Sequence, residues 1–266
     1  MKLQKTTNAA LLSSLLLTGC AASLPDSSAK VEDGTESAHE LLERADRNDL
    51  QLDSYHMHSH DAYQTGQNEE KTEFDVRVQF RDGTLYMISS FPEGSSRLAK
   101  YELKKNRNHS IDGSSFAVTS GIWAFLDPDG LLNDCFSVDD EMEVEDYISI
   151  PEVYLYSQNT FEIAQQTDAE TVIELVSLAN APAEQPEGVS FLVQFALSPE
   201  GYLKRISSKE TGPDQSYQFE RTRTFSDFNS DLINTQALER FLNQAASREI
   251  SAGQKVNLAD YLAAEN

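Results

Sequence analysis

Hydrophobic and polar residues alternate along most of the chain between residues 52 and 225. The clearest example is the run in which Phe74, Val76, Val78 and Phe80 are separated by polar residues. A period of two is typical of a strand with one buried and one wet face. Further strands are expected at 52–64, 85–91, 97–104, 110–118, 121–125, 161–164, 171–178, 189–197, 202–208 and 217–225.

Short turns separate these strands, which favours antiparallel pairing of consecutive strands. Asp82 and Gly83 form an Asp-Gly pair, which supplies the positive φ angles of a tight hairpin turn. The less regular stretch 131–158 is expected to hold one or two helices, with an acidic run at 139–146. The pattern therefore predicts an α+β fold built on an antiparallel sheet of roughly nine or ten strands.

Helical spacing appears at both ends of this sheet. Leu41, Leu42 and Ala45 predict a helix over 37–48. Ser37 and Glu40 match a capping box at its start. Residues 234–246 form a second amphipathic stretch, and 257–264 predict a short final helix; both are expected to dock on the sheet or lie at its edge.

The first residues carry a different pattern. Lys2 and Lys5 precede a short apolar run, and the run ends in Leu17-Thr18-Gly19-Cys20. A positive start followed by 7–15 apolar residues is typical of a secretory signal peptide. The last four residues resemble the lipobox of bacterial lipoproteins. That resemblance implies a diacylglycerol on Cys20, cleavage before it, and a membrane anchor made of palmitate-like acyl chains.

The rest of the chain resembles LolA/LppX-like proteins. The resemblance lies in the opening helix and first strand (41–57), the strand–Asp-Gly–strand unit (80–86), and the late segments 201–206 and 224–229. It implies a curved half-barrel sheet with helices packed on its concave side, a C-terminal helix, and an apolar cavity for a lipid-like ligand. The expected organisation is a signal peptide at 1–19, the lipidated Cys20 and a flexible tether at 20–36, the half-barrel at 37–230 and a helical tail at 231–266.

Composition narrows the possible partners. The chain has 44 acidic and 21 basic residues, a net charge of −23. Such a surface repels phosphate backbones and anionic head groups, so nucleic-acid binding is not expected and membrane contact must come from the lipid on Cys20. We expect an extracytoplasmic, membrane-anchored protein, at the outer membrane if the source is Gram-negative. The sequence names no protein partner.

Two groups of residues are candidates for binding. His56, His58 and His60 share one face of a strand and could bind a metal weakly, although neighbouring positions on one strand converge poorly on a single ion. The more economical interpretation places Tyr55, Met57 and Ser59 inward and the histidines on the wet face. The candidates for an apolar cavity are Tyr55, Met57, Trp123 and Phe125.

The sequence contains no Gly-x-Ser-x-Gly, no His-Glu-x-x-His and no glycine-rich phosphate loop. We therefore expect no enzymatic activity and no cofactor. The leading hypothesis is a lipoprotein that binds or shields an apolar ligand. The alternatives are an envelope interaction module with a filled core and an acidic surface, and a weak metal-binding lipoprotein.

Replacing Cys20 by Ala tests the anchor. Because the acyl chains are the expected membrane contact, the Cys20→Ala protein should move from the membrane fraction to the soluble extracytoplasmic fraction, as followed by fractionation and immunoblotting. Equal membrane retention of the variant and the unmodified protein would contradict the lipoprotein interpretation.

Overall fold

The computed structural model describes residues 36–49, 51–105, 116–127, 129–130, 132–138, 150, 152–155, 158–177, 188–247, 249–250 and 254–263. The lipobox, most of the expected tether and the acidic run at 139–146 lie outside these ranges. Residues 36 to 266 form one compact unit.

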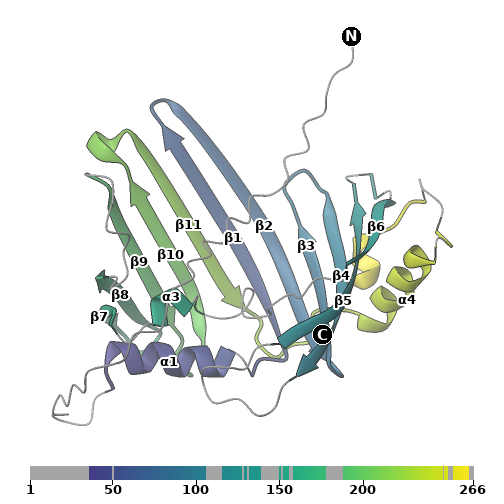
Figure 1. Ribbon diagram of the computed structural model, residues 1–266, viewed down its shortest axis with the longest axis horizontal. Helices are drawn as coiled ribbons and strands as arrows, with labels where there is room; N and C mark the ends of the chain where they lie inside the picture. The colour runs from purple at the N-terminus through teal and green to yellow at the C-terminus, as the bar shows by residue number, and fades with distance from the viewer. Residues whose placement is uncertain are drawn as a thin grey trace. The chain divides into compact units, whose positions relative to one another are not determined.

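Eleven strands form a single antiparallel sheet in the order β6-β5-β4-β3-β2-β1-β11-β10-β9-β8-β7 (Figure 1). The predicted fold class is therefore confirmed, with a strand count just above the expected nine or ten. The strands are β1 (Ser54–Thr65), β2 (Asn68–Arg81), β3 (Thr84–Ser90), β4 (Ser96–Lys105), β5 (Phe116–Leu126), β6 (Leu132–Val138), β7 (Thr160–Gln166), β8 (Thr171–Ser177), β9 (Ser190–Leu197), β10 (Leu203–Thr211) and β11 (Tyr217–Ser226).

The first and last strands meet at the centre of the sheet. Strand β1 pairs with β2 on one side and with β11 on the other, in register from His56 opposite Ser226 to Thr65 opposite Tyr217. Two meanders, β1–β6 and β7–β11, are thereby joined into one sheet. The hairpin between β2 and β3 turns at Asp82 and Gly83, whose φ angles of 51° and 78° are those the Asp-Gly pair predicted.

Two stretches differ from the prediction. Residues 132–138 form strand β6 rather than a helix, and the only helix described between 131 and 158 is the short α3 (Glu152–Leu155). The expected strands at 110–118 and 121–125 are a single strand over their described part, because β5 runs without a break from Phe116 to Leu126. Pairing with β4, with one register shift at Glu102/Leu103, keeps β5 continuous.

Helices cover both faces of the sheet. The face that carries Tyr55, Val78 and Met87 packs under helix α1 (Ala38–Asp49) and α3, and we call it the α1 face. The opposite face carries Ile88 and Leu98 and packs under α4 (Thr235–Ala246) and the 3₁₀ helix η2 (Leu258–Tyr261). A second 3₁₀ turn, η1 (Pro213–Gln215), joins β10 to β11.

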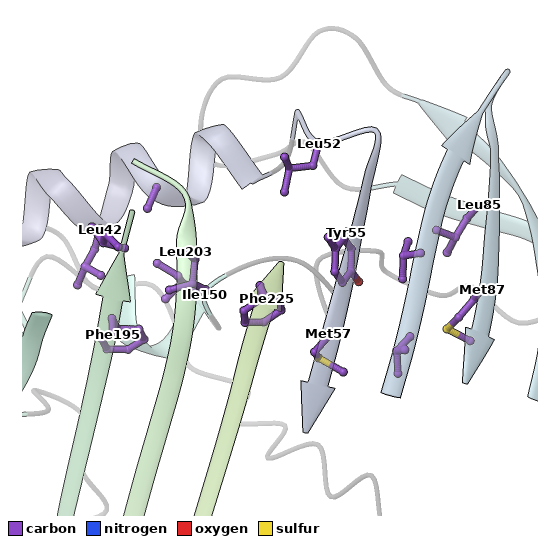
Figure 2. Close-up of a cluster of buried hydrophobic side chains, with 14 of the residues drawn as sticks. Leu42, Leu52, Tyr55, Met57, Leu85, Met87, Ile150, Phe195, Leu203 and Phe225 are labelled. Carbon is purple, nitrogen blue, oxygen red and sulfur yellow. The ribbon is translucent and has the colours of Figure 1, made fainter. Parts of the chain in front are cut away.

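Helix α1 begins as its sequence predicts. The Ser37 amide donates to Glu40 Oε2 at 2.7 Å, and the Glu40 amide donates to Ser37 Oγ at 3.3 Å, which completes the capping box. Figure 2 shows Leu42 of α1 above Phe195 and Leu203, in the cluster that also holds Tyr55, Met57 and Phe225. Leu42 is fully buried, so the apolar stripe of the helix completes this core.

A buried glutamine of β2 holds the segment that connects β11 to α4 on the opposite face of the sheet. Gln79 is 6% exposed, and its Oε1 accepts from the Leu232 and Ile233 amides at 3.1 and 2.8 Å. On the α4 face, the buried Lys100 donates to Asn243 Oδ1 at 2.7 Å. The predicted apolar stripe of α4 (Leu238, Phe241, Leu242 and Ala245) is buried against this face. These contacts dock the C-terminal helix on the sheet.

The edge strand β7 pairs irregularly with β8. The register shifts between Thr160 and Phe161 and again between Ile163 and Gln165. Six of its seven residues are exposed, as expected for an edge that solvent reaches.

A buried carboxyl couples the docking of α1 to pH. The Leu203 amide donates to Asp49 Oδ1 at 3.2 Å, while Oδ2 is buried without a hydrogen-bond partner. Burial raises the pKa of Asp49 from 3.8 to about 8. A folded-state pKa above the unfolded value means that the protonated carboxyl stabilises the fold below pH 3.8, and that this contribution is lost as pH rises to about 8.

Asp49→Asn should therefore be more stable than the unmodified protein at pH 7, because the amide keeps the acceptor for Leu203 without a charge. Between pH 4 and 8 it should also remove a slope of up to about 1.4 kcal/mol per pH unit from the free energy of unfolding. Urea denaturation at several pH values measures both effects, with Asp53→Asn at an exposed position as the control. An unchanged slope in Asp49→Asn would show that Asp49 is ionised in the folded protein.

Candidate functional site

The α1 face changes character along its strands. Near α1 it is apolar and filled, with Met57 and Phe225 paired across β1 and β11 and exposed by 6% and 9%. Farther from α1 on the same face, Ser59 of β1 pairs with Arg223 of β11, and Asp61 pairs with Arg221. We call Asp61, Arg221 and Arg223 the charged belt.

Aromatic side chains lie beyond the charged belt. Tyr63 pairs with Phe219 and stacks on Tyr217, with ring centroids 6.4 Å apart. Phe191 of β9 lies on the same face, opposite Glu210. We call Tyr63, Phe191, Tyr217 and Phe219 the aromatic rim. Tyr63 and Phe191 are 41% and 54% exposed, so the apolar character of this face continues into solvent beyond the core.

The two arginines of the belt have unlike surroundings. Arg221 is paired with Asp61 through Nε to both carboxylate oxygens at 3.1 Å and through Nη2 to Oδ2 at 2.8 Å. This bidentate geometry is the strong form of a carboxylate–guanidinium pair. The guanidinium of Arg221 also lies over the Phe219 ring, 5.3 Å from its centroid.

Arg223 lacks such a partner. Its Nε is buried with no hydrogen-bond acceptor, and no ion pair among the described residues includes it. Burial, and then the positive charge of Arg221, lower the pKa of Arg223. Tyr154 of α3 contributes to the same surroundings, and burial raises the pKa of its hydroxyl. The belt therefore carries two positive charges and one negative charge, on a face that also holds Glu210 opposite Phe219.

The predicted cavity residues all lie on the α1 face. Tyr55 and Met57 are 1% and 6% exposed and belong to the core cluster beneath α1. Trp123 and Phe125 are partly buried and pack edge to face at 4.5 Å, with the Arg97 guanidinium 4.8 Å from the Trp123 ring centroid. The structure thus brings all four to the expected face, Tyr55 and Met57 at its filled end. Their role as ligand contacts stays a prediction.

Sequence analysis did not single out the charged belt. The signal was present, because Phe219, Arg221, Arg223 and Phe225 have the same parity along one alternating strand. An alternating strand whose inward positions include two arginines indicates a charged site on a buried face.

The three histidines lie on the opposite face, beside acidic side chains of β2. Asp75 Oδ1 lies 3.0 Å from His56 Nε2 and 3.3 Å from His58 Nδ1, and Glu73 Oε1 lies 3.0 Å from His60 Nδ1. Their strand neighbours Tyr55, Met57 and Ser59 are buried, as the more economical interpretation predicted. Among the described residues, no group of three or more His, Cys, Asp or Glu side chains is arranged to hold a metal ion.

Two hollows lie away from the α1 face. The larger, of about 750 Å³, is bordered by the start of β4, the end of β5, α4 and η2, and its lining includes Ser96, Leu126, Arg240 and Tyr261. The smaller, of about 390 Å³, lies where the chain crosses past Gln79, between Asp53 and Asp231. Neither includes a predicted site residue. Within the described ranges, no helix has the length and apolar character that would let it cross a bilayer.

No protein-family model and no curated protein matches this sequence. The structure is similar to that of lipoprotein LppX from Mycobacterium tuberculosis, with 13% identity over 72% of this chain and 94% of that one and a TM-score of 0.34. It is also similar to LprF from Mycobacterium bovis, with 12% identity, coverage of 72% and 92% and a TM-score of 0.31. A LolA superfamily protein from Nitrosomonas europaea matches with 12% identity, coverage of 77% and 98% and a TM-score of 0.26.

The histidine face should bind zinc only weakly. Each imidazole lies beside a carboxylate of β2, and among the described residues no three ligand side chains are arranged around one ion, as a tight zinc site requires. Calorimetric titration with Zn²⁺ should show no stoichiometric binding at micromolar protein concentration, and His58→Ala should give the same trace. A saturable site that His58→Ala abolishes would contradict this prediction.

Proposed function

We propose that this protein is a non-enzymatic, membrane-anchored extracytoplasmic lipoprotein whose α1 face binds or shields an apolar, lipid-like ligand. The observation that carries the proposal is the exposed apolar surface on the same face of the sheet as the core. Tyr63 and Phe191 are 41% and 54% exposed at the aromatic rim, and Ile163 of edge strand β7 is 39% exposed on the same face. Clustered exposed apolar side chains mark binding surfaces more often than isolated ones do.

The proposed ligand surface is the part of the α1 face beyond the helices. At the α1 end, Leu42, Met57 and Phe225 already fill the space, so a ligand cannot enter there without displacing the core. At the other end the aromatic rim is open to solvent. An acyl chain lying on the rim would remove its own methylenes and several rings from water, at about 0.8 kcal/mol per methylene.

The N-terminal sequence supports a location outside the cytoplasm, at a membrane. The signal-like segment and Leu17-Thr18-Gly19-Cys20 favour export and lipid attachment, with residues 20–36 as the tether. The net charge of −23 disfavours direct contact between the folded domain and anionic head groups. We therefore assign membrane contact to the lipid and ligand contact to the α1 face.

An interaction module with a filled core is the alternative, and the burial of Tyr55 and Met57 favours it. The two functions differ in what the aromatic rim contacts. A lipid ligand requires the rim to bind small apolar molecules in solution, whereas an interaction module does not.

Fluorescence titration with N-phenyl-1-naphthylamine tests the rim in the full-length Cys20→Ala protein, which should need no detergent. Phe191→Ser should weaken probe binding by tenfold or more, because losing the burial of one aromatic ring costs about 1.5–3 kcal/mol. Leu192→Ser is the matched control, since Leu192 is the next residue, is 38% exposed and faces the other side of the sheet.

Mass spectrometry of lipids that copurify with the same protein provides an independent readout. We expect acyl lipids from the unmodified rim and fewer from Phe191→Ser. If the protein binds no probe and carries no lipid, the interaction module replaces lipid binding as the function.

A further inference from the structure

The charged belt lies where an amphiphile on the aromatic rim would place its polar end. Arg223 pairs across the sheet with Ser59 on one side and with Ile206 on the other, so it separates the filled core from the open rim. Ser59 is 1% exposed, so the base of the belt is shut off from solvent. An acyl chain that extends outward over Phe219 and Phe191 would end at Arg223.

The belt has the charge of an anion site. Arg221 and Asp61 neutralise each other through a bidentate pair, and Ser59 Oγ donates to Asp61 Oδ1 at 3.4 Å. Arg223 forms no ion pair among the described residues, and its buried Nε has no acceptor. Burying a charge without a partner is costly, so a ligand that supplies an acceptor here gains more than it would in water.

We propose that the α1 face selects acyl chains that end in a carboxylate, with the carboxylate bound by Arg223 and the hydrocarbon on the aromatic rim. The planar guanidinium fork matches a carboxylate. The belt's net single positive charge balances one carboxylate, whereas a phosphate monoester would bring a second negative charge close to Asp61. The protein's net charge of −23 makes this local preference for an anion unusual.

The inference rests on the proposed function, because a head-group preference requires that the rim bind an acyl chain at all. Arg97 of β4 also has a buried Nε without an acceptor, but it lies on a different strand from the aromatic rim, whose residues come from β1, β9 and β11. Its guanidinium lies over Trp123 and donates Nη2 to Tyr101 Oη at 3.3 Å, so the protein itself holds it.

The experiment compares cis-parinaric acid with its methyl ester at pH 8 in the Cys20→Ala protein. The two probes have the same acyl chain, and only the acid carries a negative charge at its end. The difference between their affinities therefore measures the contribution of the carboxylate to binding. The unmodified belt should bind the acid at least tenfold more tightly than the ester. This comparison needs no belt variant, so it stands even if a change at Arg223 impairs folding.

Arg223→Gln should weaken binding of the acid by tenfold or more and leave the ester unchanged. Arg223→Lys keeps the charge without the fork and should recover part of the preference. The matched control is Arg205→Gln, because Arg205 is an arginine of neighbouring β10 on the opposite face, where its partly exposed side chain pairs with Glu170. Circular dichroism of each variant verifies that it is folded.

The outcomes separate the two proposals. If acid and ester bind equally to the unmodified protein, the head-group inference fails and lipid binding stands. If neither probe binds, lipid binding fails and the inference fails with it. If Arg205→Gln reduces acid binding as much as Arg223→Gln does, the preference reflects overall charge and the assignment to Arg223 is wrong.

Discussion

The pairing of β1 with β11 is the interaction on which the rest of the structure depends. It joins residues far apart in sequence; the Thr224 hydroxyl, for example, reaches the carbonyl of His58, 166 residues away. Without the β1–β11 pairing, β1–β6 and β7–β11 would form two smaller sheets, each with one more unpaired edge strand. The same pairing also forms the candidate site, because Asp61 comes from β1 and Arg221 and Arg223 come from β11.

Period-two patterning predicted much of this architecture. The strands around Phe74, Leu85 and Tyr217 follow from alternation alone, and the capping box at Ser37 and the Asp82-Gly83 turn follow from local hydrogen-bonding chemistry. Strand β6 was missed because its sequence, with Asn133, Asp134 and Ser137, lacks strong alternation. It is a strand because β5 offers it a partner, and that is a tertiary effect invisible to local patterns.

The site was harder to predict than the fold. Alternation places Tyr55, Met57 and the histidines on their correct faces, because facing depends only on parity. It does not reveal that Arg221 forms an ion pair with Asp61 while Arg223 does not. That distinction depends on the register between β1 and β11, which brings together residues 160 positions apart. Whether Tyr55 lies in a filled core or lines a cavity is equally a matter of packing against residues distant in sequence, such as Phe225, and both kinds of wall use the same residues.

The irregular edge at β7 has a consequence for a protein that carries an exposed apolar face. A straight, unpaired edge strand is a template on which other chains can add strands, and neighbouring apolar surface favours such growth. The two register shifts against β8 bend and interrupt this template. The sheet can therefore keep an adhesive surface open to ligands without extending, chain by chain, into a fibre.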